Sequence, residues 1–366
     1  MYELKRIYDA HVHYRPISDS FDENIQNIQD FLGFSTIAGI NILLLRERLN
    51  TLGDDAPCLY AKALYPEKVS VFNGLAIGYS TIPVDSEGLV NQVKELIEAG
   101  FDGFKMISTL STKETWGFEI DDDRCDAMFS LLEETQFPIT WHVGNTEHWP
   151  VQRGPGSDFL LKNPYKPGNE PDNEPLYGRL EHVLEKHPKL NLMIPHWLFM
   201  SEHFDRLDNF MQRHPNVTID ITPGSAMLHY MGLEREKWHD FVVRYQDRIV
   251  FGTDNFLFIM HGALDQYTIV RRFLETGDTF FTPFVPTHSY GFEITGIGPF
   301  SDKILQKIYW DNFDRIRGGV RPLDLPKAIA FLEKELEQME PLSTEQVSER
   351  NRSITRKAIA RLKAML

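Results

Sequence analysis

The chain has 366 residues, of which 42% are hydrophobic and 25% charged, a composition typical of a globular protein. Acidic side chains exceed basic ones and give a formal net charge of -15, which argues against general binding to nucleic acids or to an anionic membrane surface. The chain has only two cysteines, Cys58 and Cys125, and no run of about 18 apolar residues that would predict a membrane span. We therefore expect a cytoplasmic protein with free thiols and a core that folds without disulfides.

Short apolar runs alternate with helix-like stretches through most of the chain. Strands are predicted at 6–12, 41–45, 69–75, 103–107, 138–143, 190–195, 217–221 and 248–252. Helices are predicted at 23–38, 55–65, 86–99, 123–135, 176–187, 202–213, 234–246 and 264–276. Continuous apolar strands that alternate with helices are typical of a parallel sheet covered on both faces. Eight such units predict an α/β protein with a (β/α)8 TIM barrel; a doubly wound open sheet is the competing architecture.

Two segments do not fit the repeat. Residues 145–175 contain six prolines and no helical or strand periodicity, which predicts a long loop after strand five, on the catalytic face of a barrel. Residues 321–366 have a helical pattern on either side of Pro341. We therefore expect a barrel domain at 1–320 and a helical C-terminal extension at 321–366. The extension packs either on the barrel or on a second subunit, and the latter would make the protein a homo-oligomer.

Residues suited to metal binding lie where the predicted strands end. His11 and His13 are two positions apart on the first strand, so both imidazoles point to the same face. Further polar residues lie inside or just after later strands: Lys105, His142, His196 and Asp254. Burying these polar and charged groups without a shared binding partner would cost free energy. A shared divalent metal would offset that cost.

These positions resemble the amidohydrolase superfamily, and the phrases around them resemble its amidohydrolase-related branch. The segment DRIVFGTD at 247–254 is similar to that branch's eighth-strand signature, and KIYWDNF at 307–313 is similar to the helix that follows. The resemblance extends over about residues 7–318. It implies a metal-dependent hydrolase or decarboxylase, and it does not identify the substrate.

The resemblance also implies roles for individual residues. His11, His13, His142 and Asp254 would hold one metal, with zinc as the default choice and manganese or iron as alternatives. Asp254 would also move the proton of the attacking water. His196 would act as an acid or base beside the metal, or as a ligand of a second metal. In that binuclear case, a carboxylated Lys105 would bridge the two metals; otherwise its ammonium group would contact a substrate carboxylate or an aspartate.

Four further residues are candidates for contact with a substrate. Arg46 follows strand two, where it could clamp a carboxylate or form a structural ion pair. Tyr14 follows the two histidines of strand one, and Trp197 follows His196 as a candidate apolar wall. His229 lies in the loop that we expect after strand seven.

The sequence thus favours a hydrolase that uses metal-activated water on an ester, lactone or amide, with Asp254 as the proton shuttle and His196 assisting. The alternative is a non-oxidative, metal-dependent decarboxylase of an unsaturated or aromatic carboxylic acid. A third hypothesis is a barrel that binds a ligand without turnover. In each case the expected partner is a small molecule.

Overall fold

The computed structural model describes residues 7–34, 37–46, 51–109, 112–145, 172–222, 225–257, 260–282, 284–285, 289–290 and 293–366. Within these ranges, the side chains of 225–226, 260–265, 284–285 and 289–290 are not described. Nearly all of the long segment predicted after strand five therefore lies outside the described residues.

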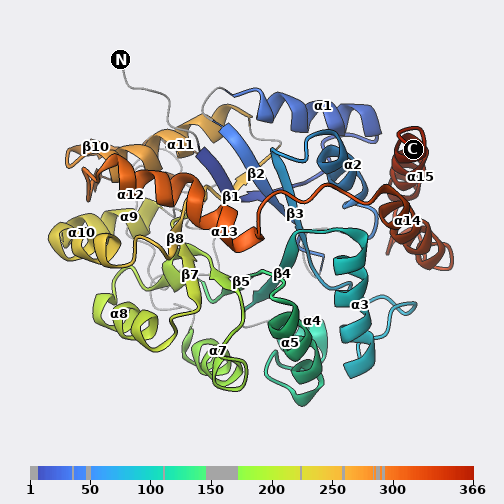
Figure 1. Ribbon diagram of the computed structural model, residues 1–366, viewed down its shortest axis with the longest axis horizontal. Helices are drawn as coiled ribbons and strands as arrows, with labels where there is room; N and C mark the ends of the chain where they lie inside the picture. Colours follow the sequence, from blue (N-terminus) through green and yellow to red (C-terminus); the bar gives the residue numbers. More distant parts are fainter. Residues whose placement is uncertain are drawn as a thin grey trace.

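A parallel sheet curls around the centre of the molecule, with helices outside it (Figure 1). Its strands are β1 (Ile7–His13), β2 (Ile37–Leu43), β3 (Val69–Asn73), β4 (Gly103–Ser108), β5 (Ile139–Val143), β6 (Leu192–Ile194), β7 (Val217–Asp220), β8 (Ile249–Val250) and β9 (Asn255–Phe256). Their order in the sheet is β8-β7-β6-β5-β4-β3-β2-β1-β9. Strands adjacent in sequence are thus adjacent in space, and the predicted (β/α)8 TIM barrel is confirmed.

The barrel closes through an eighth strand that is split in two. β8 pairs with β7, whereas β9 pairs with β1. Between these two pieces, the Ala10 amide donates to the Phe251 carbonyl and the Asp254 amide donates to the His11 carbonyl, both at 2.9 Å. These bonds join the last strand to the first and fix Asp254 directly beside β1.

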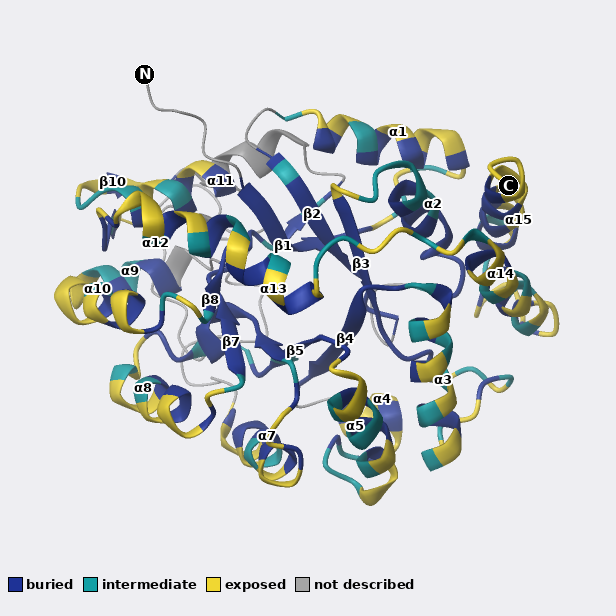
Figure 2. Ribbon diagram, in the orientation of Figure 1, coloured by how far each residue is buried: buried dark blue, intermediate teal, exposed yellow. Residues whose placement is uncertain are grey.

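The outer layer consists of helices that bury one face and expose the other (Figure 2). They are α1 (Phe21–Leu32), α2 (Ala56–Leu64), α3 (Ser86–Ala99), α4 (Thr112–Trp116), α5 (Asp123–Thr135), α7 (Glu174–Lys186), α8 (Phe204–Arg213), α9 (Ser225–Leu233), α10 (Arg235–Arg244), α11 (Met260–Glu275), α12 (Asp302–Gln306), α13 (Asn312–Arg317), α14 (Leu325–Met339) and α15 (Glu349–Lys363). A 3-10 turn, η1 (His196–Phe199), follows β6, and a π-helical turn, η2 (Lys307–Asp311), precedes α13. Short strands β10 (Thr279–Phe281) and β13 (Glu293–Thr295) pair with each other, as do β11 (Phe284–Val285) and β12 (Ser289–Tyr290).

Helix boundaries follow the capping residues. α3 has its predicted limits because the Asp85 side chain accepts a hydrogen bond from the Gly88 amide, and Gly100 ends the helix with φ 86°. The helix predicted at 23–38 was too long: α1 ends at Leu32, Gly33 caps it, and β2 already begins at Ile37. The prediction of a loop after strand seven was also wrong, because α9 occupies that region.

The C-terminal extension is helical and lies on the outside of the barrel. α14 packs against α3 and α15, and α15 packs against α2 (Figure 1). The division of the chain at residue 320 stays a prediction.

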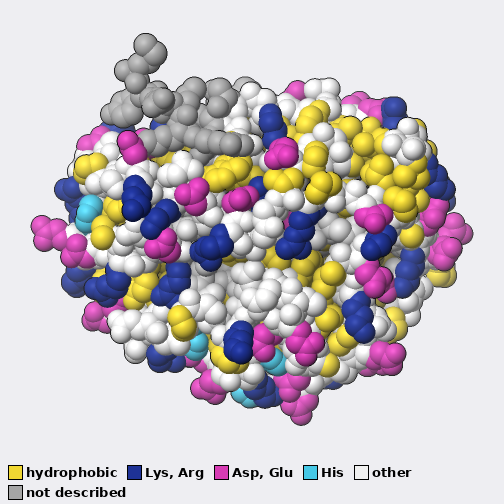
Figure 3. All heavy atoms as spheres, in the orientation of Figure 1, with side chains coloured by type: hydrophobic (Ala, Val, Ile, Leu, Met, Phe, Trp, Pro, Cys, Tyr) yellow, Lys and Arg dark blue, Asp and Glu magenta, His cyan; other side chains and the backbone are white. Residues whose placement is uncertain are grey.

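The face of the molecule in Figure 3 carries acidic and basic side chains interspersed with each other. In the described part of the chain, none of the helices combines the length and the apolar character needed to cross a bilayer.

Candidate metal centre

Two histidines of β1 meet the carboxylate of Asp254 at the C-terminal ends of the barrel strands. His11 Nε2 lies 3.2 Å from His13 Nε2. Asp254 Oδ1 lies 3.3 Å from His11 Nε2 and 3.0 Å from His13 Nε2. The backbone of Asp254 has φ 57°, a left-handed conformation that non-glycine residues rarely adopt and that turns the carboxylate toward β1.

The other ring nitrogen of each histidine fixes its tautomer. His11 Nδ1 lies 2.7 Å from Asp220 Oδ2, and His13 Nδ1 lies 2.9 Å from the Leu43 carbonyl oxygen. Both partners only accept hydrogen bonds, and the Thr222 hydroxyl, 3.1 Å from His11 Nδ1, donates to Asp220 Oδ1. Each Nδ1 therefore carries the proton. In the neutral rings, two Nε2 lone pairs and one carboxylate oxygen therefore face each other at 3.0–3.3 Å. Electron-pair donors in this arrangement repel one another unless a proton or a metal cation lies among them, and two imidazoles with a carboxylate are a ligand set that fits a divalent metal.

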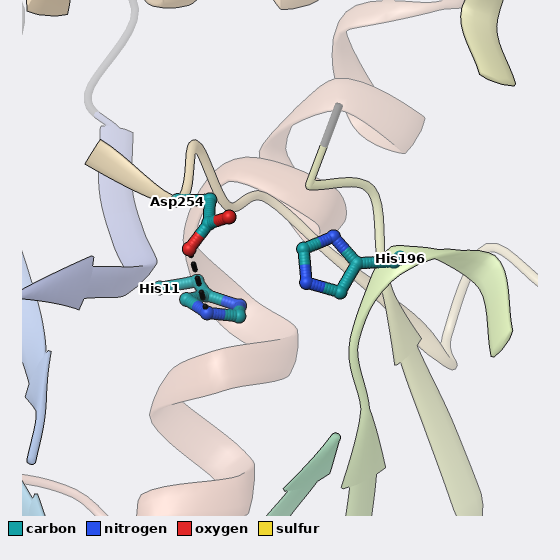
Figure 4. A group of neighbouring side chains, drawn as sticks. All are labelled: His11, His196 and Asp254. Carbon is teal, nitrogen blue, oxygen red and sulfur yellow. Dashed lines mark ion pairs between the residues drawn. The ribbon is translucent and has the colours of Figure 1, made fainter. Parts of the chain in front are cut away.

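His196 approaches the same point from the opposite side (Figure 4). The ligand atoms of His11, His196 and Asp254 all lie within 4.8 Å of one another. His196 begins the turn η1, in which all four residues have φ between 51° and 59°. A left-handed turn of this length without glycine is strained by about 1–2 kcal/mol per residue. The surrounding structure must therefore hold it in place.

Asp220 is a site residue that the sequence analysis missed. It ends β7, is fully buried, and accepts hydrogen bonds from the His196 and Thr222 amides at 2.9 and 3.1 Å, as well as from His11 Nδ1. The available signal was the alternation of Thr218, Asp220 and Thr222, which puts three polar side chains on one face of an otherwise apolar strand.

The ring of His142 lies next to this group, but its Nε2 faces a backbone carbonyl oxygen. Its ring centroid is 4.9 Å from that of His196, and its Nε2 donates to the Gly144 carbonyl at 3.0 Å. Its ligand atoms do not belong to the three-residue group of His11, His196 and Asp254. Phe199 stacks on His196 at 4.9 Å, and Phe256 lies 5.2 Å from His13, so aromatic rings flank the histidines on two sides.

Lys105 is buried in β4 at 1% exposure. Burial is the main cause that lowers the pKa of His13, His142 and His196, and the Lys105 charge lowers it further; at His11 the same charge opposes a rise in the pKa. The ammonium group is therefore within electrostatic reach of all four rings. The barrel interior thus combines one cationic side chain with the carboxylates of Asp220 and Asp254.

Burial and neighbouring charges shift the pKa values of the histidines in different directions. Burial lowers the pKa of His196 to about 4, and it also holds the pKa of His142 well below 6.5. Burial lowers the pKa of His13 as well, because Asp254 offsets it only in part. For His11, burial is outweighed by the Asp220 carboxylate, so the pKa is raised. Most of these rings are therefore neutral near pH 7, as metal ligation requires.

Arg46 forms ion pairs away from the histidines. Its guanidinium group lies 3.2 Å from Asp55 Oδ2 and contacts Glu335 of α14. All three side chains are buried. Of the two roles considered for Arg46, the geometry therefore matches the structural ion pair and not the substrate clamp.

The other three candidates for substrate contact have neighbours of their own in the protein. Tyr14 is buried at 1% exposure, and its pKa is raised by that burial and by the nearby Cys58. The indole of Trp197 packs against Trp238 of α10, with ring centroids 5.7 Å apart. His229 Nδ1 donates to the Glu293 carbonyl at 2.6 Å on the exposed side of α9.

Solved structures with the same fold come from several proteins. An amidohydrolase II has a TM-score of 0.51 and 14% identity, with 85% of this chain and 99% of that chain covered. An uncharacterized TIM-barrel protein from Bordetella bronchiseptica has a TM-score of 0.50 and 14% identity, covering 88% and 99%. A 2,6-dihydroxybenzoate decarboxylase from Rhizobium has a TM-score of 0.50 and 12% identity, covering 86% and 98%. These likenesses establish a shared fold.

A search of curated proteins finds no match to the chain. A family model described as Amidohydrolase matches residues 64–315, which is more than half of the sequence. That range includes His142, His196 and Asp254, and the fold places His11 and His13 beside them. The chain therefore belongs to the amidohydrolase family.

Proposed function

We propose that the protein is a metal-dependent hydrolase of a small-molecule ester, lactone or amide. The observation that supports this most directly is the convergence of two imidazole lone pairs and a carboxylate oxygen at 3.0–3.3 Å, with both tautomers set by Nδ1 hydrogen bonds. His11, His13 and Asp254 would hold one divalent metal, with a further ligand from His142 or His196. Zinc is the default for such a nitrogen and oxygen set, and manganese or iron are alternatives.

A bound metal of this kind lowers the pKa of water toward neutrality and polarises a carbonyl oxygen. Asp254 is suited to accept the proton of the attacking water, because its side chain is 16% exposed whereas that of His11 is fully buried. It would then return the proton to the leaving group. His196 is neutral near pH 7, since burial lowers its pKa to about 4, and would donate a hydrogen bond to the developing oxyanion.

Lys105 would add a positive charge at the base of the site. Its charge reaches all four histidines, so an anionic substrate group or intermediate would be stabilised there. If Lys105 is instead carboxylated, Lys105 and His196 would be the residues that hold a second metal.

The second candidate function is non-oxidative decarboxylation of an unsaturated or aromatic acid. It draws support from the fold shared with the Rhizobium decarboxylase and from the two phenylalanine rings, Phe199 and Phe256, that flank the histidines. In that reaction a proton would be delivered to the substrate carbon, and Asp254 would not accept one from an attacking water.

The test is a substrate screen on metal-loaded protein that measures acid release and carbon dioxide release in parallel. Hydrolysis of lactones, esters or amides should be lost with chelator, restored by metal, and reduced by at least roughly 100-fold in Asp254→Asn. The matched control is His182→Gln on α7, whose histidine side chain is 47% exposed and should not affect turnover. Carbon dioxide release without net consumption of water would replace the hydrolase by the decarboxylase. Turnover that survives both chelator and Asp254→Asn would contradict both.

A further inference from the structure

The carboxylate of Asp220 contacts two of the site histidines through different atoms. Oδ2 faces the imidazole Nδ1 of His11 at 2.7 Å. Oδ1 accepts the backbone N–H of His196 at 2.9 Å. Asp220 itself is 0% exposed and lies at the end of β7. One buried side chain therefore links a residue of β1 to the turn that follows β6.

The hydrogen-bond partners fix which end of the carboxylate faces which histidine. Oδ1 accepts from three donors: the His196 amide, the Thr222 amide at 3.1 Å and the Thr222 hydroxyl. Any side chain that replaces Asp220 must keep an oxygen at this position, because both amides can only donate. The other end of the side chain must then face His11 Nδ1.

His13 provides an internal comparison for His11. Both rings present Nε2 to the same point, but His13 Nδ1 donates to the neutral Leu43 carbonyl, whereas His11 Nδ1 donates to an anionic carboxylate. A carboxylate partner raises the basicity of a ligating imidazole and orients its ring. His11 is therefore the stronger electron-pair donor of the two.

The same carboxylate anchors the first residue of the strained turn. His196, Trp197, Leu198 and Phe199 all have positive φ, so the turn needs contacts that prevent it from relaxing. The His196 amide is held by Asp220, and the Leu198 carbonyl accepts from the Tyr177 hydroxyl at 3.0 Å. The position of the His196 imidazole thus depends on Asp220.

Close packing leaves this arrangement little freedom to shift. A Cβ atom on Gly252 would lie 2.9 Å from His11 Cβ and 2.9 Å from Thr222 Oγ1, and 3.6 Å from Asp220 Cγ. The backbone at Gly252, between β8 and β9, therefore packs closely against His11 and Thr222, next to Asp220.

We propose that Asp220 is the positioning residue of the metal centre: it fixes His11 as the Nδ1-protonated tautomer and holds His196 within reach of His11 and Asp254. The role in metal binding rests on the proposed function, whereas the tautomer and the turn do not. Asp220 touches no substrate in this account and acts only through the two histidines.

The test variant is Asp220→Asn, which keeps the shape of the side chain. Its oxygen would stay with the two amides, so its NH2 group would face His11 Nδ1 and donate to that nitrogen, while the Thr222 hydroxyl, 3.1 Å from Nδ1, still donates to the side-chain oxygen. The His11 proton would then move to Nε2 and block the lone pair that points at the centre. We expect the dissociation constant for Zn²⁺, measured by chelator competition, to rise roughly 10- to 100-fold.

The matched control is Asp102→Asn, which changes another buried aspartate next to a barrel strand. Asp102 pairs with Lys62 at 2.7 Å and precedes β4, at the opposite end of the strands from the histidines. This variant should lose stability without a change in Zn²⁺ affinity. An equal loss of affinity in both variants would show a general structural effect and overturn the positioning role.

A second readout needs neither activity nor metal. Long-range proton–nitrogen NMR of the metal-free, histidine-labelled protein reports the tautomer of His11, assigned with a His11→Gln variant. We expect the proton on Nδ1 in the unsubstituted protein and on Nε2 in Asp220→Asn. A neutral His11 ring with its proton on Nε2 and none on Nδ1 in the unsubstituted protein would overturn the proposal even if the variant does not fold.

The two readouts separate this inference from the proposed function. If the unsubstituted protein binds no metal, the proposed function fails, and the NMR result alone decides whether Asp220 sets the tautomer. If it binds metal and Asp220→Asn has the same affinity and the same tautomer, the inference fails while the metal centre stands.

Discussion

Neutral, buried histidines make the metal-free protein sensitive to acid. The pKa of His196 is lowered to about 4 by burial, whereas an unfolded chain titrates near 6.5. Between these values the unfolded state binds more protons, so this contribution is fully present above pH 6.5 and is lost as the pH falls toward 4. By pH 5 the loss amounts to about 2 kcal/mol for His196, and His142 acts in the same direction.

The measurement is the free energy of unfolding of metal-free protein at pH 7 and pH 5, for the unsubstituted chain and for His196→Gln. Because other groups titrate as well, the difference between the two chains isolates His196. We expect the unsubstituted protein to lose more stability than the variant. Equal losses would mean that His196 is already protonated, or freely hydrated, in the folded state.

A substitution at Gly252 tests how tightly the side chains around His11 are packed. A methyl group there would approach His11 Cβ and Thr222 Oγ1 to 2.9 Å, closer than real Cβ contacts, so Gly252→Ala should destabilise the protein by about 1–3 kcal/mol. The control is Gly178→Ala on the exposed surface of α7, where a Cβ meets nothing within 4 Å. That substitution should stabilise the helix by up to about 1 kcal/mol. Similar effects at both positions in chemical denaturation would contradict the packing around His11.

Single residues also show what the sequence could not reveal. Alternation along β1 correctly put His11 and His13 on one face, because a strand has a period of two. The link from Asp220 to His11 joins residues 209 positions apart, and no local pattern encodes such a pair. Arg46 is a similar case: its partner Glu335 lies on a helix that the sequence pattern could not orient against strand two.

Elements were predictable where capping residues marked them and less so elsewhere. Asp85 and Gly100 gave α3 its limits, whereas α9 had no such signal, and its apolar residues resembled a pocket loop. The turn η1 was not predictable at all, because left-handed backbone usually requires glycine and the sequence there is HWLF. Its conformation comes from tertiary contacts.

One of the contacts between α14 and the rest of the protein is a buried ion pair. Glu335 is 2% exposed, contacts Arg46, and accepts the Gly53 amide at 3.2 Å. Of the two carboxylates that contact the buried Arg46, Glu335→Gln would leave that of Asp55. We therefore expect the free energy of unfolding to fall by about 2–4 kcal/mol.

Glu333→Gln is the control on the same helix. Its side chain is 46% exposed and pairs with Lys363 on the surface, so the change should stay within about 0.5 kcal/mol. If chemical denaturation gave the two variants equal stability, the buried pair would not be what fastens α14 to the barrel.

For the molecule as a whole, the eight repeating units and their apolar strands were enough to predict a barrel. Closure was not contained in that pattern, since it depends on a split eighth strand that pairs with β7 on one side and β1 on the other. This closure is also what brings Asp254 to His11 and His13. The fold and the proposed metal centre are thus two consequences of the same contact between the first strand and the last.

The most direct test of the account is the metal content of protein purified without chelator or affinity-tag metal, measured by elemental analysis. We predict about one equivalent of zinc, manganese or iron per chain, retained in the surface variant His182→Gln and lost in His13→Ala and Asp254→Ala while both remain folded. About two equivalents would point to the binuclear form with Lys105 as a bridge. No metal after refeeding, or full metal content in both site variants, would contradict the assignment of these residues as a metal centre.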